Sequence, residues 1–378
     1  MYGNPALLVM HFKFNALPVV FNPYAIKQPE VSLCSGSNNF LFKQNDRTLY
    51  CACSIFFILP PEHLVLYLRT LPIIKAFQRN LTMKKNVALV LSAGGARGCA
   101  HIGAIRILEQ QGFHITSVAG TSMGALIGGI YASGQLPQFE EWISSLDMLE
   151  VLSLTDFSIS KKGLVKGEKV IKRIKEIVPS RKIEELPIPF CAVATDILNG
   201  SETVFTEGDL FEAIRASIAI PTVFQPHIID NRYFVDGGIT NPIPVNRVSR
   251  SGDDLLVVVN VSAHVPPSKR TEEPEQKPYG QYAELIESIK EKLNRLMPDK
   301  KNHDDISILN LSNKSIGTMM RRISELTLEK HKPDILISIS RQSFSTYDFY
   351  KAREIIREGE EATLETLKRM EKTGDLSK

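Results

Sequence analysis

Cysteine is scarce in this sequence, and its spacing indicates neither a disulfide framework nor a metal site. Of the five cysteines, Cys99 and Cys191 lie in apolar surroundings that are typical of a buried core. Cys51 and Cys53 form a C-x-C pair, and no second pair of histidines or cysteines follows them. A zinc site would need such a second pair, so none is predicted.

Long hydrophobic runs and strong charge are also lacking. The longest apolar stretch, CACSIFFILPPEHLVLYL at residues 51–68, is interrupted by Pro60 and Pro61, so neither half approaches the roughly 20 residues of a spanning helix. The N-terminus does not show the basic and apolar pattern of a secretory signal. The net charge is +3, and no basic tract carries interleaved aromatics. We therefore predict no transmembrane segment, no nucleic-acid partner and a cytoplasmic location, with a peripheral position at a membrane left open.

The composition changes at residue 83. Residues 1–82 hold eight of the 18 phenylalanines and three of the five cysteines, and they lack periodic segments with caps. From Met83 onward the stretch MKKNVALVLSAGG is typical of the beginning of an α/β protein. We interpret residues 1–82 as a poorly structured N-terminal extension that arises as a start-site artefact. The alternative is a genuine accessory segment that packs on the surface or touches lipid.

Apolar strands alternate with amphipathic helical patterns after residue 83. The continuous apolar run NVALVLS at residues 86–92 is typical of a strand buried on both faces. Such alternation predicts a three-layer α/β/α fold with a mainly parallel central sheet. We assign residues 83–262 to one main domain and residues 263–280 to a mobile, Pro-rich charged loop. Residues 281–378 are predicted to supply C-terminal helices and one strand that complete the fold.

The strongest candidate site is the stretch VAGTSMGALIGG. It contains a G-x-S-x-G motif, with Gly120, Ser122 and Gly124, between a predicted strand and a predicted helix. In such an elbow the glycines allow a tight reversal and the serine hydroxyl is exposed. The amide of Met123 and the helix N-terminus would then face a developing anion. This context favours a nucleophilic serine over a capping serine.

A serine nucleophile needs a base, and Asp236 in RYFVDGGITNPIPV is the candidate. It ends an apolar strand, the second arm of a hairpin that is predicted to turn at Asp230-Asn231. Gly237 and Gly238 follow, so the backbone can turn sharply and leave the carboxylate uncovered. By itself this pattern favours an ordinary Asp-Gly turn.

A glycine-rich turn, Gly94-Gly95-Ala96-Arg97-Gly98, supplies the third element. Successive small residues expose backbone N–H groups at a helix N-terminus, where they suit a phosphate or an oxyanion. Dinucleotide binding would require an acidic residue about 20 positions later, and the Walker pattern requires Gly-Lys-Ser/Thr. Neither is present, which favours an oxyanion.

The order of these elements resembles that of patatin-like phospholipases: a glycine-rich turn with arginine, then G-x-S-x-G, then D-G-G. The stretches SIAIPTVFQP and NPIPV on either side of Asp236 are also similar. The resemblance is strong over residues 86–262, and similarity to bacterial members continues into the C-terminal helix. It implies the patatin-like fold and a serine hydrolase that cleaves fatty-acyl esters of lipids, without a metal or organic cofactor.

The same resemblance implies roles for individual residues. Ser122 would be the nucleophile and Asp236 its proton acceptor, in a dyad without histidine. The amides of residues 94–96 would form the oxyanion hole, and Arg97 would support that loop. The family usually has glycine at the position of Ala93, where alanine fits only with a negative φ. Because an ordinary aspartate has a pKa of about 3.9, Asp236 needs partial burial to act as a base.

Three alternatives remain open at this point. One is a classical Ser-Asp-His esterase that uses His264, which we predict to be a surface residue. The second is a lipid-binding or regulatory protein without turnover, and the third is a nucleotide-binding module. His101 and Ser217 are predicted to have structural roles, Ser217 as a helix cap. The sequence does not distinguish phospholipid, lysophospholipid, acylglycerol and small thioester substrates, and it does not give the oligomeric state.

Overall fold

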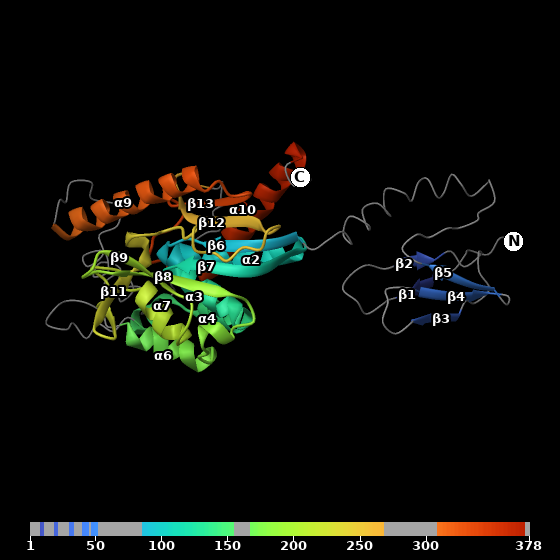
Figure 1. Cartoon of the computed structure of the whole chain (residues 1–378), viewed down its shortest axis with the longest axis horizontal. Helices are drawn as coiled ribbons and strands as arrows, with labels where there is room; N and C mark the ends of the chain where they lie inside the picture. The colour runs from blue at the N-terminus through green and yellow to red at the C-terminus, as the bar shows by residue number, and fades with distance from the viewer. Residues whose placement is uncertain are drawn as a thin grey trace, which may run out of the picture. The chain divides into compact units, whose positions relative to one another are not determined.

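The computed structural model describes residues 85–154, 167–267 and 308–374 and, before them, five short strands. These strands form a two-stranded and a three-stranded antiparallel sheet (Figure 1). Their bounds are β1 Leu8–Met10, β2 Val19–Phe21, β3 Glu30–Leu33, β4 Phe40–Gln44 and β5 Arg47–Cys51. The chain divides into two compact units, Met1–Thr82 and Met83–Lys378. The predicted poorly structured extension at 1–82 and the predicted mobile loop at 263–280 fall largely outside the described residues. Of the predicted C-terminal part, 281–378, the structure describes residues 308–374, which hold helices and one strand.

The second unit is built on a sheet that has eight strands in the described part of the chain. In chain order these are β6 Lys85–Leu91, β7 Phe113–Thr121, β8 Phe190–Asp196, β9 Ser201–Phe205, β10 His227–Ile229, β11 Arg232–Asp236, β12 Leu255–Ala263 and β13 Ile335–Ser340. Strands β8, β7, β6, β12 and β13 lie side by side and parallel. Strands β9, β10 and β11 add an antiparallel edge. The prediction of a mainly parallel sheet is therefore confirmed.

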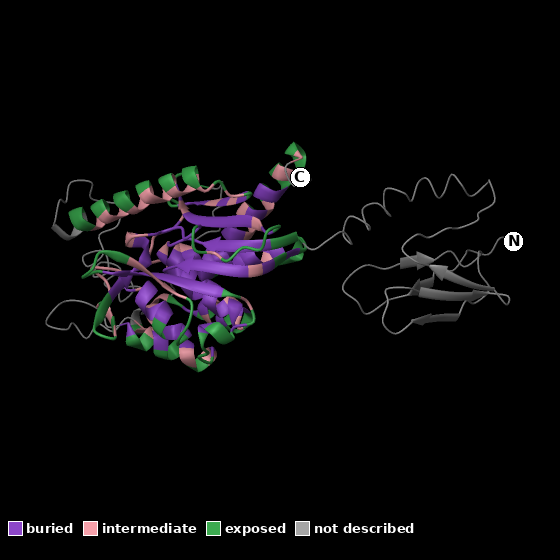
Figure 2. Cartoon of the chain, viewed as in Figure 1, coloured by how far each residue is buried: buried purple, intermediate pink, exposed green. Residues whose placement is uncertain are grey.

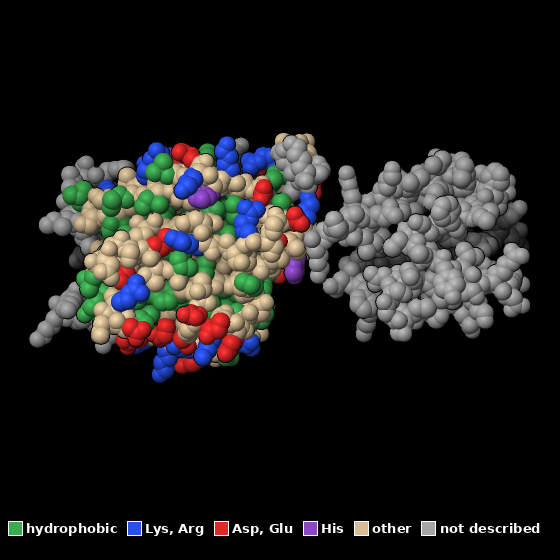
Figure 3. All heavy atoms as spheres, viewed as in Figure 1, with side chains coloured by type: hydrophobic (Ala, Val, Ile, Leu, Met, Phe, Trp, Pro, Cys, Tyr) green, Lys and Arg blue, Asp and Glu red, His purple; other side chains and the backbone are tan. Residues whose placement is uncertain are grey.

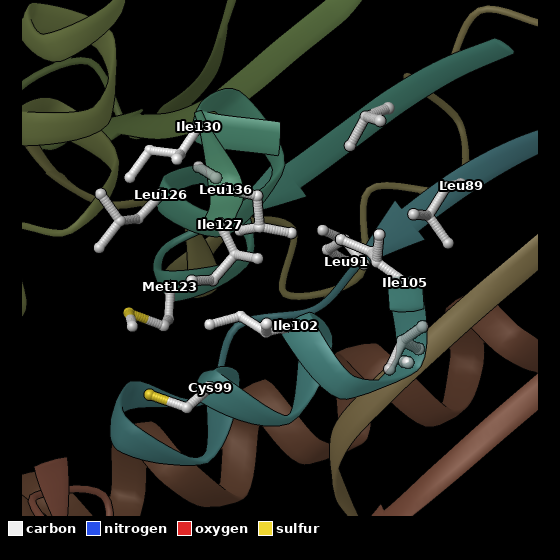
Figure 4. Packing of buried hydrophobic residues seen from close by; sticks show 14 of the residues in the cluster. Leu89, Leu91, Cys99, Ile102, Ile105, Met123, Leu126, Ile127, Ile130 and Leu136 are labelled. Atoms are coloured by element: carbon white, nitrogen blue, oxygen red, sulfur yellow. The ribbon is translucent and has the colours of Figure 1, made fainter. Parts of the chain in front are cut away.

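Helices cover one face of this sheet, and they hold most of the core. The α-helices are α2 Ala100–Gln110, α3 Met123–Ala132, α4 Leu136–Ser145, α5 Met148–Leu154, α6 Glu168–Ile177, α7 Leu210–Ser217, α9 Ile308–Lys330 and α10 Ala352–Thr373. Because side chains alternate along a strand, Val87, Leu89 and Leu91 of β6 all enter the larger core cluster. Figure 4 shows Leu89 and Leu91 beside side chains of α2 and α3, and Figure 2 shows the buried strands between more exposed helices.

The opposite face of the sheet has a smaller core. Val90 of β6 and Val258 of β12 pack there with Ile243 and Val245, and Leu328 of α9 packs against this cluster. The segment that carries Ile243 and Val245 is not helical. The predicted third layer is thus made partly of a segment of turns and bends and partly of a long helix.

Helix α9 is partly exposed along its length. Leu311, Met319 and Leu326 keep between 47% and 57% of their surface exposed, and Figure 3 shows hydrophobic side chains along its outer surface. No helix in the described ranges has the length and hydropathy to span a bilayer.

Helices α2 and α10 cross at very short range. A Cβ atom on Gly103 would lie 2.0 Å from the Ile356 carbonyl oxygen, and one on Gly359 would lie 2.1 Å from the Ala100 carbonyl oxygen. Side chains larger than hydrogen are excluded at both positions. This crossing joins α10, at the end of the chain, to the helix that follows the glycine-rich turn.

Candidate active site

The three predicted elements meet at one end of the sheet, where β6 and β7 have their carboxyl ends. The glycine-rich turn follows β6, Ser122 follows β7, and Asp236 ends β11. Strands β6 and β7 are parallel, so both turns lie at their carboxyl ends. In α/β proteins, ligands bind at the carboxyl ends of the parallel strands.

Ser122 occupies a strained turn between β7 and α3. Its backbone angles, φ 56° and ψ −124°, match the first central position of a type II′ turn. A Cβ atom on Gly120 would lie 2.3 Å from the Gly124 carbonyl oxygen, and one on Gly124 would lie 2.2 Å from the Leu91 carbonyl oxygen. Both motif glycines are therefore needed for the close approach of the chain to itself.

The expected exposure of the Ser122 hydroxyl is not observed. Only 3% of the Ser122 surface is exposed. A Cβ atom on Gly238 would lie 2.4 Å from Met320 Cε and 3.0 Å from Asp236 Oδ1. Met320 of helix α9 and the Asp236 carboxylate thus both lie beside Gly238.

Ser122 and Asp236 are in direct contact. Ser122 Oγ donates a hydrogen bond to Asp236 Oδ2 at 2.5 Å, and the Gly238 amide donates to Oδ1 at 2.7 Å. The Asp236 amide donates to the Ala219 carbonyl oxygen at 2.9 Å, which fixes the aspartate backbone. Both carboxylate oxygens therefore have a donor, and one of these donors is the candidate nucleophile.

Burial makes Asp236 a stronger base than an ordinary aspartate. Asp236 is 5% exposed, and desolvation raises its pKa to about 6, although the hydrogen bonds from Ser122 and Gly238 act to lower it. At neutral pH the carboxylate is still mainly ionised and can accept a proton. Asp236 thus has the burial that we expect an aspartate base to need.

The glycine-rich turn offers free backbone donors. No hydrogen bond in the described part of the chain engages the N–H groups of Gly94, Gly95 or Met123. The Ala96 amide differs from expectation because it donates to the Thr346 carbonyl oxygen at 2.8 Å. Gly95 has φ 58°, which favours glycine, and a Cβ atom there would lie 2.3 Å from Thr346 Cγ2. Gly94 and Gly95, with Met123, are thus the available donors.

Arg97 ties this turn to distant parts of the chain. Its Nη1 donates to the Phe344 carbonyl oxygen at 3.3 Å, and its Nη2 donates to Ser262 Oγ at 3.3 Å. Ser262 Oγ in turn donates to the Ala93 carbonyl oxygen at 3.2 Å. Ala93 is not among the residues with positive φ, so alanine fits the position where the family usually has glycine.

Other polar residues that support the site were not predicted. Thr195 Oγ1 donates to the Asp236 carbonyl oxygen at 3.1 Å. Thr121 Oγ1 donates to the Asn241 carbonyl oxygen at 2.8 Å, next to Ser122. A polar residue near the end of an apolar strand, as in FCAVATD, is the signal that could have indicated Thr195. Nothing local to residue 346 indicates its contact with the turn.

The two histidines considered from the sequence, His264 and His101, lie outside the candidate dyad. His264 is exposed, and none of its described contacts involves Ser122 or Asp236. His101 is completely buried, and its Nε2 lies 2.9 Å from the Ser92 carbonyl oxygen. Burial lowers the pKa of His101 to about 4, so the ring is neutral and Nε2 donates. Among the described residues, no group of three His, Cys, Asp or Glu side chains is arranged to hold a metal ion.

One cavity lies away from the dyad. It has a volume of about 390 Å³. Its walls include Phe113 and His114, at the start of β7, and Tyr131. Ser122 follows the other end of that strand, so this cavity is not part of the candidate site.

Comparisons with known proteins show similarity over part of this chain. The family described as patatin-like phospholipase matches residues 89–248. An uncharacterised NTE family protein of Mycobacterium tuberculosis is 45% identical over 188 residues, which are 50% of this chain and 52% of that protein. Human patatin-like phospholipase domain-containing protein 6 is 32% identical over 187 residues, 47% of this chain and 13% of that protein. The chain thus spans about half of the mycobacterial relative.

A solved structure, VipD from Legionella pneumophila, is similar over 76% of this chain and 67% of that chain, with 16% identity and a TM-score of 0.38. The family match contains the glycine-rich turn, the serine elbow and Asp236. Residues 89–248, which make up less than half of the chain, are thus similar to the patatin-like phospholipase family.

Proposed function

We propose that this protein hydrolyses fatty-acyl esters of lipids through Ser122 and Asp236. The observation that carries the proposal is the 2.5 Å hydrogen bond from Ser122 Oγ to Asp236 Oδ2, made by a buried carboxylate whose pKa is raised. Lipid acyl hydrolysis is the general activity of the family. The dyad and the oxyanion hole are specific to this proposal.

In the first half of the reaction Asp236 Oδ2 accepts the Ser122 proton while Oγ attacks the acyl carbonyl carbon. The carbonyl oxygen becomes an anion, which the N–H groups of Gly94, Gly95 and Met123 are suited to bind. Loss of one such donor typically lowers kcat about 10²- to 10³-fold. The tetrahedral intermediate then breaks its ester bond, and Asp236 returns the proton to the departing alcohol.

In the second half Asp236 accepts a proton from water, and the resulting nucleophile attacks the acyl-serine. The tetrahedral intermediate again places its negative charge in the oxyanion hole. When it collapses, the fatty acid leaves and Ser122 Oγ regains a proton from Asp236. The carboxylate thus acts as base and acid in turn, which suits a pKa nearer to neutral pH.

A Ser-Asp-His mechanism receives less support. The carboxylate oxygens of Asp236 accept from Ser122 and Gly238, whereas a triad aspartate would accept from a histidine ring. His264, the candidate for that histidine, is exposed. The dyad therefore accounts for the observed contacts with fewer movements of the chain.

The test measures hydrolysis of phospholipid, lysophospholipid, acylglycerol and thioester substrates by the wild type, Ser122→Ala and Asp236→Asn. A fluorophosphonate probe measures covalent labelling of the serine in the same proteins. We expect wild-type turnover on at least one ester, covalent labelling at Ser122, and a fall in kcat/KM of at least about 10³-fold in each variant. The matched control is His264→Ala, which should keep full activity. Loss of activity in His264→Ala would overturn the dyad, and a wild-type protein that neither hydrolyses nor labels would favour a non-catalytic lipid-binding role.

A further inference from the structure

Ser217 lies directly behind the candidate nucleophile. It is the last residue of α7, and none of its surface is exposed. Its Oγ accepts a hydrogen bond from the Ser122 amide at 2.8 Å and donates one to the Val193 carbonyl oxygen at 2.6 Å. The hydroxyl thus forms a bridge between the serine elbow and strand β8.

The Ser122 amide needs such a partner more than most backbone groups do. A buried N–H without an acceptor costs free energy. Ser122 also has φ 56° and ψ −124°, angles that a residue other than glycine keeps only when its surroundings impose them. The hydrogen bond to Ser217 is one such restraint, and it acts on the residue that carries the nucleophile.

The other end of the bridge reaches the aspartate. A Cβ atom on Gly237 would lie 2.0 Å from the Val193 carbonyl oxygen, so the backbone after Asp236 packs directly on the group that Ser217 binds. Ala194, the next residue of β8, is the register partner of Asp236. One hydroxyl therefore links the backbone of Ser122 to the strand that positions Asp236.

We propose that Ser217 is a positioning residue for acyl transfer, which holds the Ser122 elbow in register with Asp236 so that Oγ and Oδ2 remain in contact. This inference rests on the proposed function. A hydroxyl suits the position because it accepts and donates within a very small volume. Alanine in its place leaves the Ser122 amide and the Val193 carbonyl without their partner, and the strained elbow is free to relax.

The experiment compares Ser217→Ala and Ser217→Cys with Ser133→Ala as the matched control. Ser133 is also a buried serine at a helix end, and its hydroxyl donates to the Ile130 carbonyl oxygen at 2.7 Å, away from the dyad. For each variant we would measure kcat and KM on the ester that the wild type hydrolyses, the rate of fluorophosphonate labelling of the folded fraction, and Tm.

We expect Ser217→Ala to lower kcat and the labelling rate about 10- to 100-fold, the size of effect that a small misplacement of a reacting group produces, with KM within about twofold. Ser217→Cys, whose thiol is a weak donor and acceptor, should lose less. The acidic limb of the rate profile should move to higher pH in Ser217→Ala, because the hydrogen bond from Ser122 lowers the pKa of Asp236. Ser133→Ala should change Tm but not the labelling rate.

Labelling of folded Ser217→Ala at the wild-type rate would overturn the positioning role. If Ser217→Ala does not fold, Ser217→Cys takes its place as the test. Folded Ser217→Cys that labels at the wild-type rate, with an unchanged acidic limb of the rate profile, would also overturn the positioning role. A wild-type protein without hydrolysis and without labelling at Ser122 would overturn the proposed function, and this inference with it. The wild-type measurement thus separates the two failures.

Discussion

At the scale of single residues, two opposing effects set the pKa of Asp236. It is buried, which disfavours its charge, and yet it accepts hydrogen bonds from Ser122 and Gly238, which favour it. Desolvation is the larger effect, so the pKa rises to about 6. A base with this pKa is mainly charged at neutral pH and protonated in mild acid.

The activity should therefore fall as the pH is lowered through about 6. Below that pH Asp236 holds a proton and cannot accept one from Ser122, whereas above it the carboxylate is free to do so. We expect kcat/KM to be half-maximal near pH 6 and to reach a plateau at higher pH, measured by initial rates on a soluble acyl ester. Circular dichroism over the same range separates this titration from acid unfolding. A rate that stays constant down to pH 5 would contradict the assignment of Asp236 as the base.

The two residues of the candidate dyad could be singled out from the sequence because their signals are local. Ser122 lies in a five-residue motif, and Asp236 precedes two glycines at the end of an apolar strand. The engagement of the Ala96 amide by Thr346 and the burial of the Ser122 hydroxyl could not be predicted. The first depends on a segment far along the chain and the second on the contact with Asp236, and no local spacing reports such contacts.

At the scale of elements, the clearest agreement is the hairpin. Its two strands, His227–Ile229 and Arg232–Asp236, pair in antiparallel register, and both Asp230 and Asn231 have positive φ, as a tight turn of this type requires. The departure is the second face of the sheet, where a segment of turns and bends shares the cover with helix α9. A hairpin is specified by its own turn, whereas the cover of a sheet face is decided by tertiary packing.

Substitution by alanine should change stability in opposite directions at Gly359, which lies at the crossing of α2 and α10, and at Gly317, which lies in open space in α9. Gly359→Ala places a methyl group against the Ala100 carbonyl oxygen, so we expect it to lower the free energy of unfolding by about 1–3 kcal/mol. Gly317→Ala in α9 meets nothing within 4 Å and should raise it by up to about 1 kcal/mol through helix propensity. Thermal denaturation of the two variants provides the measurement. Equal shifts in Tm would show that the close crossing is not maintained.

At the scale of the whole molecule, the site depends on residues beyond the family match at 89–248. Thr346 accepts from the Ala96 amide, and Phe344 accepts from Arg97. Strand β13 pairs with β12, and Ile337 and Ile355 belong to the main core. The C-terminal segment is therefore part of both the core and the support of the glycine-rich turn.

Two shortened chains test this dependence. All residues of the candidate site lie in the unit Met83–Lys378, so a chain of residues 83–378 should keep a cooperative thermal transition and label with a fluorophosphonate. A chain of residues 83–330 lacks β13 and α10 and should lose both properties, because the edge of β12 and one face of α2 would be uncovered. Wild-type labelling by the shorter chain would show that the C-terminal segment is dispensable.

The backbone of Ser122 has one further consequence. Glycine adopts φ 56° and ψ −124° freely, whereas a serine held there costs on the order of 1–3 kcal/mol. A descendant of this chain with glycine at residue 122 would gain a relaxed turn and lose the only hydroxyl that contacts the Asp236 carboxylate among the described residues. At residue 122 the stability of the fold favours glycine, whereas the proposed reaction requires serine. In a homologue that does not need hydrolysis, replacement of this serine by glycine would therefore increase stability.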